Sequence, residues 1–123
     1  MKWITYRGKR IYAYSDTHGK HHILPANADV IICVGDIGLY TAEDAAAYMK
    51  ILGECPCPII FFIPGNHDLF FDIEPERAMR LLPPNVYLLD GAYTYGGIRF
   101  YGLSAVPWLH TEVILPTGID ILV

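Results

Sequence analysis

Three continuous apolar runs of strand length occupy the first half of the chain. They cover residues 11–14, 30–34 and 59–63 and are rich in β-branched and aromatic side chains. Strands that are buried on both faces of a parallel sheet have this composition, because neither face alternates with polar residues. The pattern therefore predicts a buried sheet that is mostly parallel.

Between the second and third runs, apolar residues recur at helical spacing. Residues 41–53 place Ala45, Tyr48, Met49 and Leu52 at helical spacing, and Thr41 stands where a capping side chain is expected. Gly53 is a plausible stop signal. The segment predicts a helix that connects two strands of the sheet.

A second, shorter helix is expected to begin at Pro75 and to end before Pro83, because proline is tolerated in the first helical turn and not in later turns. The residues predicted to face the core are Ala78, Met79, Leu81 and Leu82. Alternation of strands and helices indicates an α/β fold: a partial layered sandwich with a mostly parallel sheet and flanking helices.

The pattern changes after residue 84. A short strand is expected over residues 86–89, and two aromatic runs around Gly96 and Gly97 predict a β-hairpin. Residues 108–116 have weak periodicity and are expected to form a surface connection. A last strand is predicted over residues 119–123.

Composition narrows the class of protein. A length of 123 residues predicts a single domain over residues 1–123. The chain is 53% hydrophobic and 18% charged, which favours burial of additional surface against a partner. A net charge of -4, with scattered basic residues, disfavours an extended nucleic-acid surface. No apolar run is long enough to span a bilayer, so a soluble protein without membrane association is expected.

The cysteines indicate a reduced setting. Cys33 lies within an apolar run and is expected to be a core residue, whereas Cys55 and Cys57 have the wrong spacing for a Cys-x-x-Cys motif. Three cysteines are an odd number, and the first residues do not form a signal peptide. These features predict a cytoplasmic protein.

Polar residues that can bind metals follow each of the three apolar runs. They are Asp16 and His18, then Asp36 between two glycines, then Asn66, His67 and Asp68. Strand ends of a parallel sheet meet at one edge, so these side chains are expected to converge. Any one cluster alone would be read as an ordinary turn, cap or structural histidine. Together they favour a site for Mn, with Fe or Zn as alternatives, because carboxylate, amide and imidazole donors suit these metals.

These motifs, read as Asp-Thr-His at residues 16–18, Gly-Asp at 35–36 and Gly-Asn-His-Asp at 65–68, resemble those of the calcineurin-like metallophosphoesterase superfamily. Residues 98–102 and 118–123 are similar to its small phosphodiesterase branch. The resemblance implies that Asp16 and His18 hold one metal, that Asp36 bridges two, and that Asn66 holds the second. It also implies that His67 is catalytic. Asp68 would orient the His67 imidazole.

The same resemblance implies two later histidine motifs that would fall beyond Val123, so the chain is interpreted as truncated before them. The second metal site then retains only Asp36 and Asn66. His21 and His22 either contact a substrate phosphate or belong to a solvated turn, and His110 is expected to be exposed. An exposed last strand favours a homodimer in which the partner covers the open surface and completes or partly compensates the site.

The leading hypothesis is a metal-dependent phosphoesterase that hydrolyses phosphodiesters of small molecules through metal-activated hydroxide. The alternative is a catalytically impaired metal-binding or interaction module derived from the same fold. Activity with added Mn distinguishes the two hypotheses.

Overall fold

The computed structural model describes residues 2–15, 23–65, 67–103 and 117–123. Along the chain the elements are β1 (Lys2–Tyr6), β2 (Lys9–Tyr14), β3 (Val30–Cys33), α1 (Ala42–Glu54), β4 (Ile60–Phe62), α2 (Phe70–Ile73), α3 (Pro75–Met79), β5 (Val86–Leu88), β6 (Gly91–Tyr95), β7 (Ile98–Gly102) and β8 (Ile121–Leu122). The predicted α/β class is confirmed.

Five strands form the main sheet, in the order β1-β2-β3-β4-β5. Neighbouring strands from β2 to β5 are parallel, and β1 pairs antiparallel with β2. The expected mostly parallel sheet is therefore present. Strand β1 was not predicted, because it lies at an edge and its sequence KWITY is largely exposed or half-buried, which gives no continuous apolar run.

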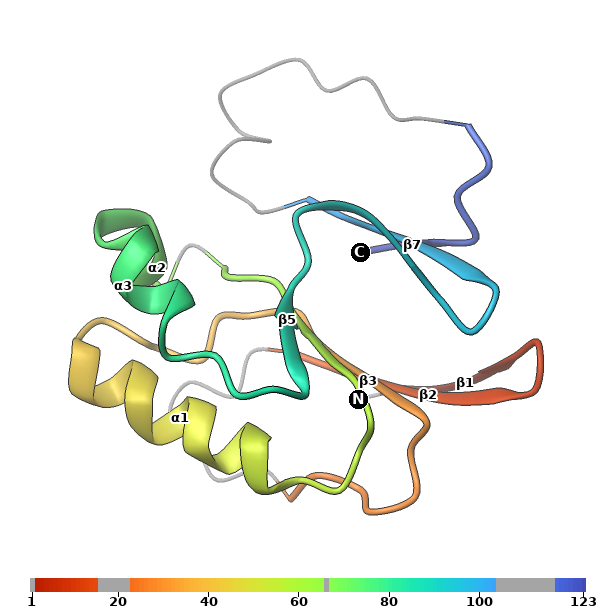
Figure 1. Cartoon of the computed structure of the whole chain (residues 1–123), viewed down its shortest axis with the longest axis horizontal. Coiled ribbons are helices and arrows are strands. Elements are labelled where there is room, and N and C mark those ends of the chain that lie inside the picture. Colours follow the sequence, from red (N-terminus) through yellow and green to blue (C-terminus); the bar gives the residue numbers. More distant parts are fainter. Residues whose placement is uncertain (1, 16–22, 66, 104–116) are drawn as a thin grey trace.

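The sheet is buried on both faces, which explains its apolar strands. Alternate residues of β3 face opposite sides, so Ile31 and Cys33 pack in one core and Val30 and Ile32 in the other. The first core, between the sheet and the helices, is termed the helix-side core. The second core, which includes Ile98 and Phe100 of β7, is termed the hairpin-side core. Figure 1 shows the helices on one side of the main sheet and the second sheet on the other.

Helix α1 begins as its sequence predicts. The Thr41 hydroxyl accepts a hydrogen bond of 3.1 Å from the backbone N–H of Asp44, and Ala45, Met49 and Leu52 are buried. The helix passes Gly53 and ends at Glu54. Short helix α2, which was not predicted, precedes α3.

Helix α3 starts at Pro75 as expected, and its Ala78 is fully buried. Leu81 and Leu82 pack against the helix-side core from the segment that follows the helix. The prediction that Met79 faces the core is wrong, because its side chain is 49% exposed. The helix ends at Met79, so the inward-facing positions do not continue along a longer amphipathic helix.

The smaller sheet has the order β6-β7-β8. Strands β6 and β7 form the predicted hairpin, and both glycines of its turn have positive φ angles, 57° at Gly96 and 77° at Gly97. Strand β8 pairs parallel with β7 and is shorter than the predicted strand over residues 119–123. The segment 108–116, expected to be a surface connection, lies outside the described residues.

The register of the main sheet shows where strands β2, β3 and β4 end relative to one another. Tyr14 of β2 is the partner of Cys33 of β3, which is the partner of Phe62 of β4. The segments that follow these three residues therefore leave the sheet at one edge, where sites of open α/β folds are built. No helix in the described parts of the chain is long and apolar enough to cross a membrane.

Candidate functional site

Three of the predicted site residues lie in the described part of the chain: Asp36, His67 and Asp68. The predicted metal ligands Asp16, His18 and Asn66 lie outside it, as do His21, His22 and His110. The structure brings the three described residues together at the carboxyl edge of the main sheet.

Two loops at this edge touch through their backbones. The first follows β3 and carries Asp36, and the second follows β4 and carries His67 and Asp68. A Cβ on Gly35 would lie 2.3 Å from the Gly65 backbone nitrogen and 2.5 Å from the Ile63 carbonyl oxygen. Gly35 also has a φ of 74°, so only glycine satisfies both the space and the backbone conformation.

Asp68 fastens the two loops together. Its side chain is fully buried, and its carboxylate accepts five backbone N–H bonds. The donors and distances are Asp36 (2.8 Å), Gly65 (2.9 Å), Ile37 (3.0 Å), Gly38 (3.0 Å) and Leu39 (3.2 Å). A charged acceptor strengthens such bonds, and the bonds offset the cost of burying the charge. We term residues 35–40, 63–65 and 67–70, held in this way, the two-loop clasp.

The clasp also fixes Asp36 relative to His67. Oδ1 of Asp36 accepts a 3.2 Å hydrogen bond from the His67 backbone N–H. A Cβ on Gly65 would lie 2.2 Å from the same oxygen, so the absence of a side chain at Gly65 makes room for the carboxylate. Among the described residues, Oδ2 of Asp36 has no hydrogen-bond partner. One carboxylate oxygen is thus used to hold the loop.

The imidazole of His67 is exposed, and its Nδ1 lies 3.0 Å from the hydroxyl of Tyr40. Tyr40 was not among the predicted site residues. The one signal in the sequence was its place between the Gly35–Gly38 loop and the cap of α1. Asp68, which was predicted to orient this imidazole, binds the backbone in the hydrogen bonds described above, and its role toward the imidazole stays a prediction. Its assignment to catalysis stays a prediction.

Below the clasp lies a buried group of two phenols and a thiol. The hydroxyls of Tyr14 and Tyr48 are 2.5 Å apart, and Sγ of Cys33 lies 3.7 Å from the Tyr48 hydroxyl. Burial raises the pKa of both phenols, and it raises the pKa of the Cys33 thiol to about 11. These groups are therefore neutral near pH 7. Cys33 is a core residue, as predicted, and its protonated thiol is unsuited to metal binding.

The described donors fit a metal only in part. Asp36 offers a half-buried carboxylate at the sheet edge, which suits a hard or borderline divalent cation. In the described part of the chain, no group of three His, Cys, Asp or Glu residues could hold a metal ion. Asp16, His18 and Asn66 lie outside the described residues and stay predicted ligands; in the sequence their motifs follow β2 and β4.

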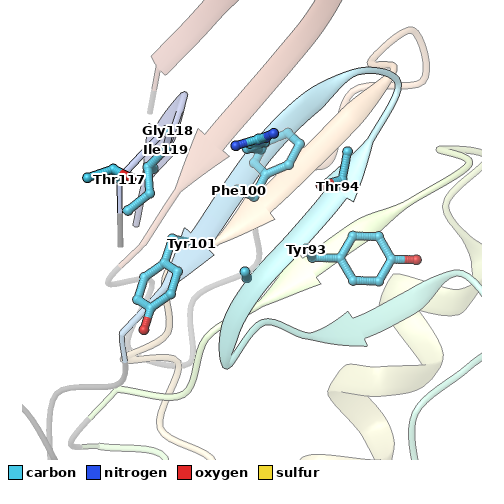
Figure 2. A pocket seen from close by; sticks show the side chains of 9 residues that line it. Tyr93, Thr94, Phe100, Tyr101, Thr117, Gly118 and Ile119 are labelled. Carbon is cyan, nitrogen blue, oxygen red and sulfur yellow. The ribbon is translucent and has the colours of Figure 1, made fainter. Parts of the chain in front are cut away.

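A hollow of about 280 Å³ lies elsewhere, on the smaller sheet (Figure 2). Its lining residues are Ala92, Tyr93, Thr94, Arg99, Phe100, Tyr101, Thr117, Gly118 and Ile119. Among these, Arg99 is charged and none is a carboxylate or a histidine. The hollow therefore does not belong to the candidate metal site.

Comparison with known proteins agrees with the arrangement of the motifs. The model of the calcineurin-like phosphoesterase family matches residues 9–117. Metallophosphoesterase domain-containing protein 1 of Homo sapiens is 28% identical over 153 aligned residues, which cover 93% of this chain and 47% of the relative. The Mus musculus protein of the same name gives the same values. This chain thus spans about half the length of the curated relatives that it matches. The chain belongs to the calcineurin-like phosphoesterase family.

Proposed function

We propose that this chain is a metal-dependent phosphoesterase that hydrolyses phosphodiesters of small molecules. The observation that carries the proposal is the two-loop clasp, which holds the Asp36 carboxylate beside an exposed His67. A metal ligand and a proton donor at fixed separation are what phosphoester hydrolysis requires, because the rate depends steeply on geometry.

In this proposal Asp16, His18, Asp36 and Asn66 hold the divalent metal, with Mn preferred and Fe or Zn as alternatives. When bound, the metal would supply positive charge that neutralises phosphate oxygens and favours ionisation of water. Asp36 uses Oδ1 to accept the His67 backbone N–H and keeps Oδ2 for the cation. Asp68 contributes by keeping the two loops at a fixed distance.

His67 is the proposed catalytic residue. Its imidazole is exposed at the sheet edge, where it can donate a proton to the oxygen of the departing group. The side chains of His21 and His22 are proposed to contact the substrate phosphate, since their segment follows the first metal motif closely.

The test is hydrolysis of bis(p-nitrophenyl) phosphate by the purified chain with added Mn. Asp36→Ala is expected to abolish the activity, whereas Asp72→Ala, which changes an exposed carboxylate on α2, should leave it intact. His67→Ala is expected to abolish the hydrolysis of a phosphodiester with an alkyl leaving group, which needs a proton. No hydrolysis with Mn, Fe, Zn or Ni would contradict the proposal. It would favour the alternative, a non-catalytic metal-binding or interaction module.

We also propose that the chain forms a homodimer through β8. Among the described strands, β8 has β7 on one side and none on the other, and its Leu122 is 53% exposed. Such edges favour pairing with a second strand, and the partner could then contribute donors to the second metal site. Light scattering should give a dimer that Leu122→Lys weakens, and a clean monomer at micromolar concentration would refute this proposal. A cytoplasmic location likewise stays a prediction.

A further inference from the structure

The side chain of Tyr40, in the loop after β3, contacts the imidazole of His67, in the loop after β4. Its hydroxyl lies 3.0 Å from Nδ1 of the imidazole, and the two residues are 27 positions apart in the chain. The contact therefore depends on the fold and not on neighbouring sequence. A histidine that donates a proton through one ring nitrogen needs its other nitrogen held, because that second contact sets the ring orientation and the position of the ring proton.

Both ends of this contact are attached to the clasp. On the Tyr40 side, the backbone N–H of Leu39 donates to Asp68 at 3.2 Å, and the carbonyl of Leu39 accepts from Phe70 at 3.1 Å. On the other side, the backbone N–H of His67 donates to Asp36. The Tyr40 ring also lies close to Gly38, where an added Cβ would be 3.7 Å from Cε2. The backbone on each side of the Tyr40–His67 contact is thus fixed.

The direction of this hydrogen bond is tied to the ring nitrogen that carries the proton. A phenol hydroxyl can accept from a protonated Nδ1 or donate to an unprotonated one, and donation places the proton of the neutral ring on Nε2. A carboxylate partner would have the opposite effect, because it accepts from a protonated Nδ1. A neutral ring that carries its proton on Nε2 can act directly as a proton donor.

We propose that Tyr40 is a positioning residue for His67: its hydroxyl donates to Nδ1, fixes the rotation of the ring and keeps the proton on Nε2. The consequence for catalysis rests on the proposed function, since Nε2–H would then donate to the departing oxygen. As Nε2 gives its proton to the departing oxygen and forms the O–H bond of the alcohol, Nδ1 takes the proton of the Tyr40 hydroxyl, so the ring stays neutral and the phenolate regains a proton from solvent. The tautomer itself is a property of the chain without substrate.

The first test is the ¹⁵N spectrum of the histidine side chains in the full chain at alkaline pH, with the His67 signals assigned by their loss in His67→Gln. The wild-type ring should show an unprotonated, hydrogen-bonded Nδ1 and a protonated Nε2. In Tyr40→Phe the Nδ1 signal should move toward the tautomer mixture of free histidine. The matched control is Tyr87→Phe, which removes a hydroxyl from a comparably exposed tyrosine on β5. Identical His67 signals in wild type and Tyr40→Phe would overturn the proposal.

The second test compares two leaving groups in the hydrolysis of phosphodiesters. Tyr40→Phe should lower kcat roughly five- to tenfold for an alkyl leaving group, which needs a proton, with little change in KM. The loss should be much smaller for p-nitrophenolate, which leaves without one. An equal loss of kcat for both substrates would indicate a merely structural role. If the wild-type chain hydrolyses neither substrate, the proposed function fails, and the nitrogen signals still decide the role of Tyr40.

Discussion

Side chains of opposite hydrogen-bonding character hold the loops at the carboxyl and amino ends of the parallel strands, which are termed the carboxyl edge and the amino edge. At the carboxyl edge, buried Asp68 accepts five backbone N–H groups of two loops. At the amino edge, half-buried Asn85 donates through Nδ2 to three backbone carbonyls, those of Leu52, Cys55 and Cys57, each at 3.3 Å. One edge is thus held by a charged acceptor and the other by a neutral donor.

The difference explains why the candidate site lies at only one of these edges. The Asp68 carboxylate accepts hydrogen bonds from the amides of residues 36–39, so a fixed backbone carries the half-buried side chain of Asp36 and the exposed side chain of His67. The Asn85 amide joins the end of α1 to the start of β4, and the carbonyls it binds come from apolar residues. We infer that the amino edge closes the fold and that the carboxyl edge holds functional groups.

The largest predicted effect is that of Asp68→Ala. This change leaves five N–H groups without their acceptor, and each unsatisfied buried group costs about 1–3 kcal/mol, partly recovered by water. The free energy of unfolding in urea should fall by at least about 3 kcal/mol. Asp72→Ala, at an exposed position on α2, should change it by less than about 0.5 kcal/mol. A loss for Asp68→Ala as small as that of the control would disprove the clasp.

Gly65→Ala should have the next largest effect. Its Cβ would lie 2.2 Å from Oδ1 of Asp36 and 2.7 Å from the Asp36 backbone nitrogen, so the Asp36 loop must move. Overpacking of this kind costs about 1–3 kcal/mol in unfolding free energy. The amide resonance of Asp36 should shift as well. In Gly97→Ala, where φ is 77° and nothing lies within 4 Å, only backbone strain is expected and the Asp36 resonance should stay in place.

Asn85→Ala should lower the free energy of unfolding by about 1 kcal/mol. Three carbonyls then lose a neutral donor, which costs less than the loss of a charged acceptor by five amides. Asn85→Asp places a carboxylate, which can only accept hydrogen bonds, next to three carbonyls that are also acceptors. It should therefore destabilise the fold more than Asn85→Ala does. Urea unfolding of the two variants measures the difference. Equal stability for the two would mean that the Asn85 amide does not hold this edge.

The smallest effect concerns a carboxylate that accepts one backbone N–H in a partly exposed place. The Arg99 N–H donates to Asp120 at 2.8 Å and is the main reason that the pKa of this carboxyl is lowered, with further help from the Tyr6 hydroxyl and Arg7. A lowered pKa stabilises the fold above the unfolded value, near pH 4, and this stabilisation is lost as pH falls through the folded value. Asp120→Asn should therefore flatten the fall of stability below about pH 4. An unchanged pH profile would contradict this assignment.

The sequence predicted most of the sheet, because β3 and β4 are buried on both faces and carry no alternation that could be misread. It missed β1 at the sheet edge, where three of the five positions are exposed, and α2, whose four residues are too few for a helical period. The order of the strands in the sheet was not predicted.

The candidate site was predicted in position but not in detail. Motif spacing located Asp36, His67 and Asp68 at one edge, as the register of β3 and β4 confirms. The spacing of motifs does not show which hydrogen-bond donors a carboxylate contacts. The hydrogen bonds from the amides of residues 36–39 to Asp68 could therefore not be predicted from the sequence. The Tyr40–His67 contact was missed for the same reason, since tyrosine before a helix cap is an ordinary surface residue.

The central claim, that Asp68 clasps two loops into one rigid unit, is tested most directly by hydrogen exchange at the amides of Ile37 and Leu39. These amides belong to no helix or strand, and their acceptor is Oδ1 of Asp68. The account predicts that they exchange as slowly as the amides of β3 and β4, because opening them requires breaking the clasp. Exchange as fast as that of ordinary exposed loop amides would contradict it.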